Sequence, residues 1–341
     1  MIDREGHWAA SELSPLEGWS VESLREATAA LDCWLPFLRQ SALPSSWDSL
    51  FTFFDQMEEL FSPLPSSVRC AIESSLMQLV ASREEQSLSK WLYGGEAREL
   101  LPHAVLLPHT EKRSLSFEVS QTALYIKKKC RPSIEEIAQI TALCKELSVQ
   151  QKLILDANRS CSLSFFCKLF AQSRVRKKVL FVEEPLASPD DFPLFFQKTK
   201  VHYGLDESLR EERQLSQDLL SPRQGAAALI VKPTLSGGRA LFNWSKLAQK
   251  WDLSIYVSAA YESSVQLILL LHLAALLPNL LAVGLDTVRA FSPSSFPLAF
   301  FWNSHSFSRL RAAQLFRSFV PQLLWNEAPS LSPLSSSSAL F

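Results

Sequence analysis

Charged residues that end short apolar runs are the feature of this chain that most restricts its fold. Five such runs end at Asp156, Glu183, Asp206, Lys232 and Glu262, with room for about one strand plus one helix between successive ends. A charge is costly on a buried strand, but it is tolerated where the strand emerges into a polar site. Because active sites of (β/α)₈ barrels lie at the carboxyl ends of their strands, the pattern predicts an α/β fold of this type.

The strand-like runs number eight, as a closed parallel barrel requires. They cover residues 103–107, 123–129, 152–156, 179–184, 201–206, 228–232, 254–259 and 280–286. Intervening segments such as SIEEIAQITALCKEL have the amphipathic spacing of an outer helix. We therefore predict that residues 103–290 form a (β/α) barrel that carries the active site.

The two ends of the chain differ from this region. Residues 1–102 show helical periodicity at 20–40 and 66–86, after serine-rich starts that suit helix N-caps. The segment 291–341 is rich in Phe, Ser and Pro. We expect it to return to the N-terminal region, with its last dozen residues disordered.

Composition excludes several classes of protein. A hydrophobic share of 47%, a charged share of 20% and a net charge of −1 indicate a globular protein with no field that favours nucleic acid or anionic membrane. The six cysteines form no CxxC pair, so we expect reduced thiols in a cytoplasmic protein without a signal peptide. Residues 265–285 are apolar, but the Pro278-Asn279 pair divides them, which favours a buried helix followed by a strand over a membrane span. The oligomeric state stays open.

Lysines end the second strand run. Alternation along a strand places Lys127 and Lys129 on one face and Lys128 on the other. If the first face points into the barrel, two ammonium groups reach the rim, and Lys232 approaches them from across the barrel. One lysine then serves as a base while another stays cationic. A solvated basic strand end is the alternative interpretation.

Three carboxylates end three consecutive strand runs: Asp156, Glu183 and Asp206. Neighbouring strands lie about 4.8 Å apart, so side chains at equal height converge. Carboxylate oxygens with positions left for water and substrate suit Mg²⁺. Taken singly, each acid is more typical of an ordinary surface carboxylate or a helix N-cap.

A glycine pair follows the sixth run. The chain has only 9 glycines, and Gly237-Gly238 falls at a strand-to-helix turn where backbone N–H groups can hold an anion. A plain tight turn explains the pair equally well.

Together these motifs resemble the enolase superfamily, in its muconate-lactonizing-enzyme-like branch, and within it the o-succinylbenzoate synthase family of menaquinone biosynthesis. The motifs are KKK (127–129), LDANRS (155–160), FVEEP (181–185), LDESLRE (205–211), IVKPTLSGG (230–238), SAAYESS (258–264) and GLDT (284–287). Residues 8–24 are similar to the capping-domain loop that closes over substrate. The resemblance implies a TIM-type (β/α) barrel and an N-terminal α+β capping domain over residues 1–102, here shortened at its start.

The resemblance also implies site residues and a reaction. Lys129 is the expected base, Lys127 completes the K-x-K pair, and Lys232 stabilises the enolate. The expected Mg²⁺ ligands are Asp156, Glu183 and Asp206, with Mn²⁺ as a substitute metal. The expected substrate-binding residues are Gly237, Gly238, Ser258, Glu262 and Ser263. The implied reaction is dehydration of a small dicarboxylate, 2-succinyl-6-hydroxy-2,4-cyclohexadiene-1-carboxylate, to o-succinylbenzoate through a metal-stabilised enediolate, with neither nucleic acid nor membrane as partner.

Two other functions remain open from the sequence. Lysines on both barrel faces would also serve an N-acylamino acid racemase or a cycloisomerase of the same superfamily. Arg131 and Gln266 stand where the superfamily usually carries glycines, which fits a non-catalytic barrel. Retention of all six charged site residues favours an enzyme.

Overall fold

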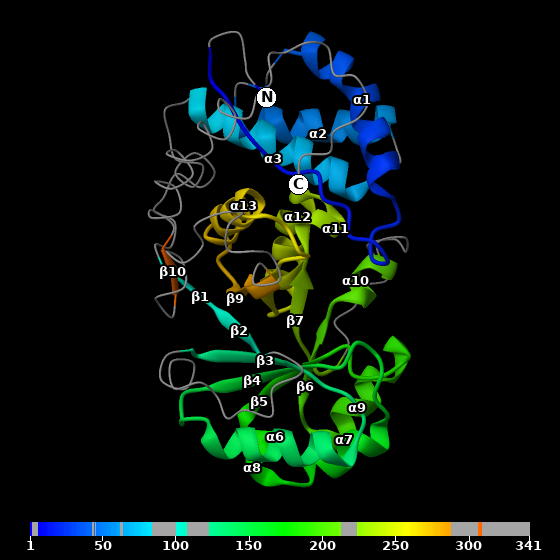
Figure 1. The fold of residues 1–341 in the computed structure, drawn as a ribbon, viewed down its shortest axis with the longest axis vertical. Helices are drawn as coiled ribbons and strands as arrows, with labels where there is room; N and C mark the ends of the chain where they lie inside the picture. Colours follow the sequence, from blue (N-terminus) through cyan, green and yellow to red (C-terminus); the bar gives the residue numbers. More distant parts are fainter. Residues whose placement is uncertain are drawn as a thin grey trace.

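Eight parallel strands curl into a nearly closed barrel in the computed structural model of the chain (Figure 1). The structure describes residues 1, 6–42, 44, 46–61, 64–83, 100–107, 123–212, 224–287 and 306–308. The barrel strands are β2 (Ala104–Leu107), β3 (Tyr125–Lys129), β4 (Lys152–Asp156), β5 (Val179–Glu183), β6 (His202–Leu205), β7 (Ala226–Val231), β8 (Ser254–Ser258) and β9 (Leu280–Gly284). They pair in chain order, and a parallel bridge between His103 and Val283 joins the two ends of the sheet. The predicted barrel and its eight strand runs are confirmed.

Helices follow the strands on the outside of the barrel. They are α6 (Ile134–Glu146), α7 (Leu163–Phe170), α8 (Ser173–Lys178), α9 (Phe192–Thr199), α10 (Glu207–Glu212), α11 (Pro233–Ser236), α12 (Gly238–Lys250) and α13 (Ser264–Ala274), with a short 3₁₀ helix at Pro189–Asp191. The apolar stretch 265–285 is thus a helix followed by strand β9, as predicted. Among the described residues, none of the helices combines the length and hydrophobicity that a bilayer crossing demands.

Three N-terminal helices form a further layer on α11 and α12 (Figure 1). They are α1 (Leu24–Gln40), α2 (Trp47–Phe61) and α3 (Ser66–Arg83). Ser23 starts α1 with a capping box, because its hydroxyl accepts from the Glu26 backbone N–H while the Glu26 carboxylate accepts from the Ser23 backbone N–H. Strand β1 (Leu100–Pro102) pairs antiparallel with β10 (Ser306–Ser308). The rest of segment 291–341, including its predicted disordered end, lies outside the described residues.

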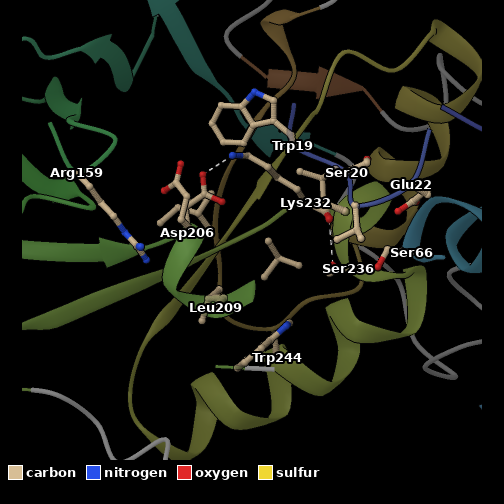
Figure 2. Close-up of a pocket in the computed structure, with 15 residues that line it drawn as sticks. Trp19, Ser20, Glu22, Ser66, Arg159, Asp206, Leu209, Lys232, Ser236 and Trp244 are labelled. Carbon is tan, nitrogen blue, oxygen red and sulfur yellow. Dashed lines mark hydrogen bonds and ion pairs between the residues drawn. The ribbon is translucent and has the colours of Figure 1, made fainter. Parts of the chain in front are cut away.

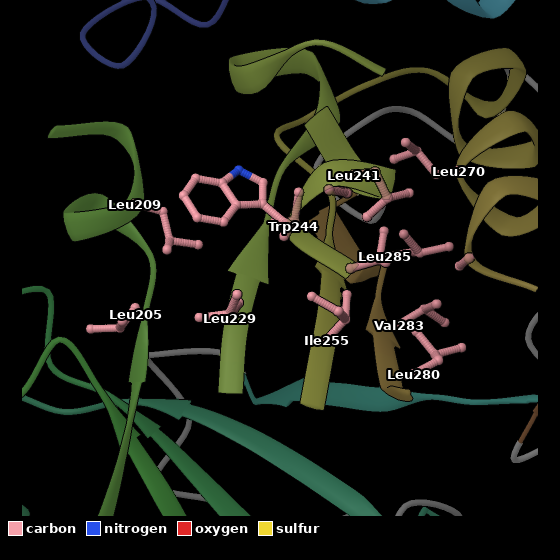
Figure 3. Packing of buried hydrophobic residues seen from close by; sticks show 14 of the residues in the cluster. Leu205, Leu209, Leu229, Leu241, Trp244, Ile255, Leu270, Leu280, Val283 and Leu285 are labelled. Atoms are coloured by element: carbon pink, nitrogen blue, oxygen red, sulfur yellow. The ribbon is translucent and has the colours of Figure 1, made fainter. Parts of the chain in front are cut away.

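The strands bury apolar residues on both faces. Figure 3 shows Leu229, Ile255 and Val283 on the strands packed toward Leu241 and Trp244 of α12. On the inner face, a second cluster fills the barrel with Ala104, Ile154, Phe181, Ala228, Ile230, Tyr256 and Ala282. Burial on both faces explains why these runs are continuously apolar in sequence. The side chains at the carboxyl ends of the strands form the next layer above this inner cluster.

Glycine at position 204 is required by this inner packing. A Cβ there would lie 2.6 Å from Ile230 Cδ1 and 2.9 Å from Phe181 Cε2. Gly204→Ala is therefore expected to lower the free energy of unfolding by about 1–3 kcal/mol through overpacking. Urea denaturation measures the change, and the exposed substitution Val149→Ala serves as the control. Equal midpoints for both variants would contradict this account.

Candidate active site

Six charged side chains form the layer above the inner cluster, at the carboxyl ends of the strands. They are Lys127, Lys129, Asp156, Glu183, Asp206 and Lys232. Lys129 pairs in register with Asp156, which in turn pairs with Glu183. Since side chains of one strand face share a spacing of two residues, the charges stand above Ile154, Phe181 and Ile230 of the inner cluster. The structure thus brings all six predicted charges to one rim.

Lys127 is a buried cation between two carboxylates. Its Nζ lies 2.7 Å from Glu183 Oε2 and 3.1 Å from Asp156 Oδ2, and it stands 5.6 Å from the centre of the Tyr256 ring. Burial alone would lower the pKa of Lys127, but the charges of Asp156 and Glu183 outweigh it and raise this pKa well above its usual value. A permanently charged lysine stabilises anions and does not act as a base.

Lys129 is the more accessible lysine of β3. Its side chain is 40% exposed, and its Nζ lies 2.8 Å from Asp156 Oδ2 while also donating to Asn158 Oδ1. Lys128 points to the opposite face, where its Nζ lies 2.7 Å from Glu136 Oε1. The predicted alternation of the three lysines agrees with these contacts. Of the two rim lysines on β3, Lys129 is the one that a substrate can reach.

The carboxylates respond to their surroundings in opposite directions. Burial opposes the ionisation of Asp156, but the charges of Lys127 and Lys129 lower its pKa to about 2. Burial raises the pKa of Glu183 well above its usual value, and the neighbouring charge of Asp156 adds to this effect. Asp206 Oδ2 accepts from Lys232 Nζ, and the charge of Asp206 outweighs burial to raise the pKa of Lys232. Each acid therefore has a lysine ammonium as its counter-charge.

The three acids fit a divalent cation in chemistry. All are buried, and Asp156 Oδ1 has no hydrogen-bond partner, which is unusual for a buried oxygen and consistent with a metal-facing atom. In the described part of the chain, no three acidic, imidazole or thiol side chains stand close enough together to hold an ion as they are. Instead, the Lys127 ammonium contacts Asp156 and Glu183, and the Lys232 ammonium contacts Asp206. Binding of a cation would therefore exchange ammonium contacts for metal contacts.

A cavity of about 540 Å³ opens beside Asp206 and Lys232 (Figure 2). The loop before α1 forms one wall, and its Trp19 ring lies 5.1 Å from Lys232 Nζ. Arg159 faces the cavity from the other side, near Asp206. Leu209, Leu235 and Trp244 give it an apolar end. The cavity thus combines two cationic side chains with an apolar surface, and its lining also includes the acids Glu22, Asp206 and Glu207.

The glycine pair lies at the start of α12, against the N-terminal layer. Gly237 has a φ of 94°, and a Cβ there would lie 2.8 Å from Arg69 Cδ, so glycine is required. The Glu73 carboxylate of α3 accepts from the Arg239 backbone N–H at 2.7 Å. This helix N-terminus therefore already has an anionic partner from the chain itself.

The other predicted substrate-binding residues follow β8. Ser258 is buried, and its hydroxyl donates to the Ala259 carbonyl at 3.3 Å. Glu262 is fully buried and accepts from Thr234 Oγ1 at 2.6 Å. Ser263 caps α13, and its backbone N–H donates to Glu12 Oε2 at 2.8 Å. These three residues, like the glycine pair, do not line the described cavity.

Sequence reasoning missed four residues at this rim: Trp19, Asn158, Arg159 and Glu184. The last three have positive φ angles of 42°, 60° and 45°, a region that non-glycine residues adopt uncommonly. Polar residues shortly after the runs that end at 156 and 183, namely Asn158, Arg159 and Glu184, were the available signal. Trp19 is far away in sequence, and only the fold brings it to Lys232.

Comparison with known proteins supports the same family. No family model matches the chain. The o-succinylbenzoate synthase of Enterobacter sp. (strain 638) is 29% identical over 293 residues, which cover 84% of this chain and 80% of the relative. That of Klebsiella pneumoniae (strain 342) is 28% identical over 298 residues, covering 85% and 81%. These relatives confirm the predicted resemblance.

Solved structures agree on the fold. The 2-chloromuconate cycloisomerase of Rhodococcus opacus 1CP superposes with a TM-score of 0.70 at 20% identity, covering 84% of this chain and 81% of that one. The dipeptide epimerase of Cytophaga hutchinsonii, complexed with Mg and a dipeptide, gives 0.69 at 18% identity, covering 85% and 79%. The fold is that of the enolase-superfamily barrels. The curated relatives identify the chain as an enzyme, a lyase related to the o-succinylbenzoate synthases.

Proposed function

We propose that the chain catalyses the Mg²⁺-dependent dehydration of 2-succinyl-6-hydroxy-2,4-cyclohexadiene-1-carboxylate to o-succinylbenzoate. The observation that carries the proposal is the pair of opposed amines at the rim. Lys129 ends β3, and Lys232 follows β7, four strands away in the eight-stranded sheet. A substrate lying between them meets a reachable amine on one face and a partly buried ammonium on the other.

The reaction requires removal of a weakly acidic proton beside a carboxylate. Lys129 in its neutral form takes this proton, which breaks the C–H bond, and returns it to the departing hydroxide as the C–O bond breaks. Water leaves, and the ring becomes aromatic. Lys232 faces the negative charge that develops on the substrate carboxylate, and its ammonium stabilises that charge.

Asp156, Glu183 and Asp206 would hold the metal, Mg²⁺ or its substitute Mn²⁺. When bound there, the ion supplies Lewis acidity to the substrate carboxylate. Lys127 adds a fixed positive charge beneath the same position, because it contacts both Asp156 and Glu183. The unpartnered Asp156 Oδ1 supports this assignment.

The cavity suits a substrate with two carboxylates and an apolar ring. Arg159 and Lys232 provide the cationic groups, and carboxylates bind such groups through charge-assisted hydrogen bonds. Leu209 and Trp244 provide the apolar contact. Gly237, Gly238, Ser258, Glu262 and Ser263 stay proposed substrate-binding residues, although none of them lines this cavity.

The test is an ultraviolet assay of o-succinylbenzoate formation with purified protein, with and without EDTA. We expect turnover that EDTA abolishes and that added Mg²⁺ restores. Turnover that persists in EDTA would remove the metal from the mechanism. Absence of product with Mg²⁺ present, from folded protein, would reject the proposed reaction.

Trp19 offers a second test of the cavity. Its ring covers Lys232 from a loop whose next turn is anchored, because Glu22 Oε1 accepts from Ser67 Oγ at 2.6 Å at the start of α3. We propose residues 1–102 as the unit that closes over substrate in this way. Trp19→Ala is expected to raise KM by roughly 2- to 10-fold, which corresponds to losing a contact of about 0.5–1.5 kcal/mol between the Trp19 ring and the substrate ring. Trp19→Phe should retain most of the affinity, and an unchanged KM in the alanine variant would remove Trp19 from the substrate cavity.

A further inference from the structure

Glu184 is a fully buried acid that the proposed mechanism does not use. Its Oε1 accepts from the backbone N–H groups of Asp206 and Ser208, at 2.8 Å and 3.0 Å. Its Oε2 accepts from Ser208 Oγ at 2.8 Å and from Arg159 Nε at 2.7 Å. Four donors from two different loops therefore converge on one carboxylate. A surface acid that was buried by chance would not be satisfied so completely.

The backbone turns Glu184 into this position. Side chains alternate along a strand, so the residue after the inward-facing Glu183 would normally face the outer helices. A φ of 45° at Glu184 breaks the alternation. The Glu184 backbone also bonds in both directions, because its carbonyl accepts from Arg159 N at 2.8 Å and its N–H donates to Gly204 O at 3.1 Å. Glu184 thus links the ends of β4, β5 and β6 through its backbone and its side chain.

These three strand ends carry the three acids proposed as metal ligands. Arg159 comes three residues after Asp156, Glu184 follows Glu183 directly, and Ser208 comes two residues after Asp206. Ser208 Oγ also accepts from Arg159 Nη2 at 3.0 Å, which closes the network. A change in the network would therefore move the acids relative to one another, and with them the oxygens available to a cation.

We propose that Glu184 is a positioning residue that sets the spacing of Asp156, Glu183 and Asp206 for the divalent cation, through Arg159 and Ser208. The inference rests on the function proposed above. Glu184 does not touch the cation. It acts through the acids, as outer partners of metal ligands do in other proteins, where their loss weakens metal affinity or activity by about 10- to 100-fold.

The alternative is that the network only stabilises the fold, since breaking a buried ion pair is destabilising anywhere in a protein. Metal binding separates the two cases. Glu136 supplies the matched control, because it is also a buried acid paired with a cation, the 2.7 Å contact to Lys128 on the outer face of β3. Glu136→Gln removes a comparable charge without touching the rim network.

The experiment is calorimetric titration of Mg²⁺ into the full chain without substrate, for wild type, Glu184→Gln, Ser208→Ala and Glu136→Gln. In Glu184→Gln an amide replaces one acceptor oxygen of a four-donor site. We expect about 10- to 100-fold weaker Mg²⁺ binding in this variant and a smaller loss in Ser208→Ala. Glu136→Gln should bind Mg²⁺ like the wild type. In assays, saturating Mg²⁺ should restore most of kcat to Glu184→Gln.

The outcomes distinguish this inference from the proposed function. Wild-type affinity in both Glu184→Gln and Ser208→Ala would overturn the positioning role and leave the proposed reaction standing. An equal loss in Glu136→Gln would assign the effect to stability and would also overturn it. A wild-type chain that binds no Mg²⁺ would reject the metal in the proposed function, and the inference with it. If Glu184→Gln does not fold, Ser208→Ala decides the question, because it removes a hydroxyl and leaves the buried charges paired.

Discussion

Lys129→Ala is expected to lower kcat by about 10²- to 10⁴-fold, the contribution typical of a positioned general base. The reason is that Lys129 is the rim lysine of β3 that solvent and substrate reach, whereas Lys127 is buried between Glu183 and Asp156. The fold should be retained, since a side chain that is 40% exposed contributes little to the core. The ultraviolet assay at saturating Mg²⁺ measures the loss, and calorimetry measures metal binding in the same variant.

The neighbouring Lys128 provides the control for this prediction. Lys128→Gln removes the same charge one residue away, but on the outer face of the strand beside Glu136. It should keep turnover close to the wild-type value in folded protein. Wild-type-like aromatisation by Lys129→Ala, or an equal loss in both variants, would contradict the assignment of Lys129 as the base.

Asp206→Asn is expected to shift the Mg²⁺ dependence of activity to higher concentration by at least about tenfold, since loss of an outer partner alone costs 10- to 100-fold. The substitution keeps the shape of a buried side chain but removes one of three anionic ligands. It also removes the counter-charge of Lys232, whose raised pKa depends on Asp206. We therefore expect a lower pKa for the Lys232 amine as well. A titration of turnover against Mg²⁺ measures the shift.

Asp252→Asn is the control for Asp206→Asn. Asp252 is exposed in the turn before β8, at the opposite end of the strand from the site, and its φ of 54° is one that asparagine adopts readily. Its Mg²⁺ titration should match that of the wild type. An unchanged titration in Asp206→Asn would remove this residue from the ligand set.

The barrel could be predicted from the sequence because its strands are buried on both faces and charged at one end. Continuous apolar runs such as 228–232 and 280–286 stand out against amphipathic helices, and Asp156 and Glu183 mark where each strand leaves the core. Of the three N-terminal helices, α1 and α3 were equally visible, and Ser23 and Glu26 form a capping box at the start of α1. Helix α2 (Trp47–Phe61) was not predicted. Local sequence patterns were sufficient to predict the barrel strands, α1 and α3.

The six rim charges were also predictable, because alternation with a period of two residues decides which lysines of β3 face inward. The ion pairs that these charges form could not be predicted. Sequence gives no indication that Lys127 lies between two acids or that Lys232 meets Asp206, since these contacts depend on the lengths of side chains across the barrel. The convergence of acids on one cation is still a prediction that metal titration must test.

Two features of the site depend on backbone conformations or long-range contacts that no local sequence pattern predicts. Glu184 reaches Asp206 and Ser208 only because its φ is positive, which reverses the expected direction of its side chain. Trp19 reaches Lys232 because the N-terminal helices pack on α11 and α12, an arrangement of segments far apart in the chain. Both residues became candidates only from the structure.

Glu73 and Glu12 restrict how the N-terminal layer of this barrel can be replaced by that of a related protein. The carboxylate of each accepts a hydrogen bond from the N-terminus of a barrel helix, from Arg239 N–H at α12 for Glu73 and from Ser263 N–H at α13 for Glu12. A barrel transplanted away from residues 1–83 would expose two positive helix ends, and buffer anions would compete for them. A foreign N-terminal layer grafted onto this barrel must therefore bring an acidic side chain to each of these two positions.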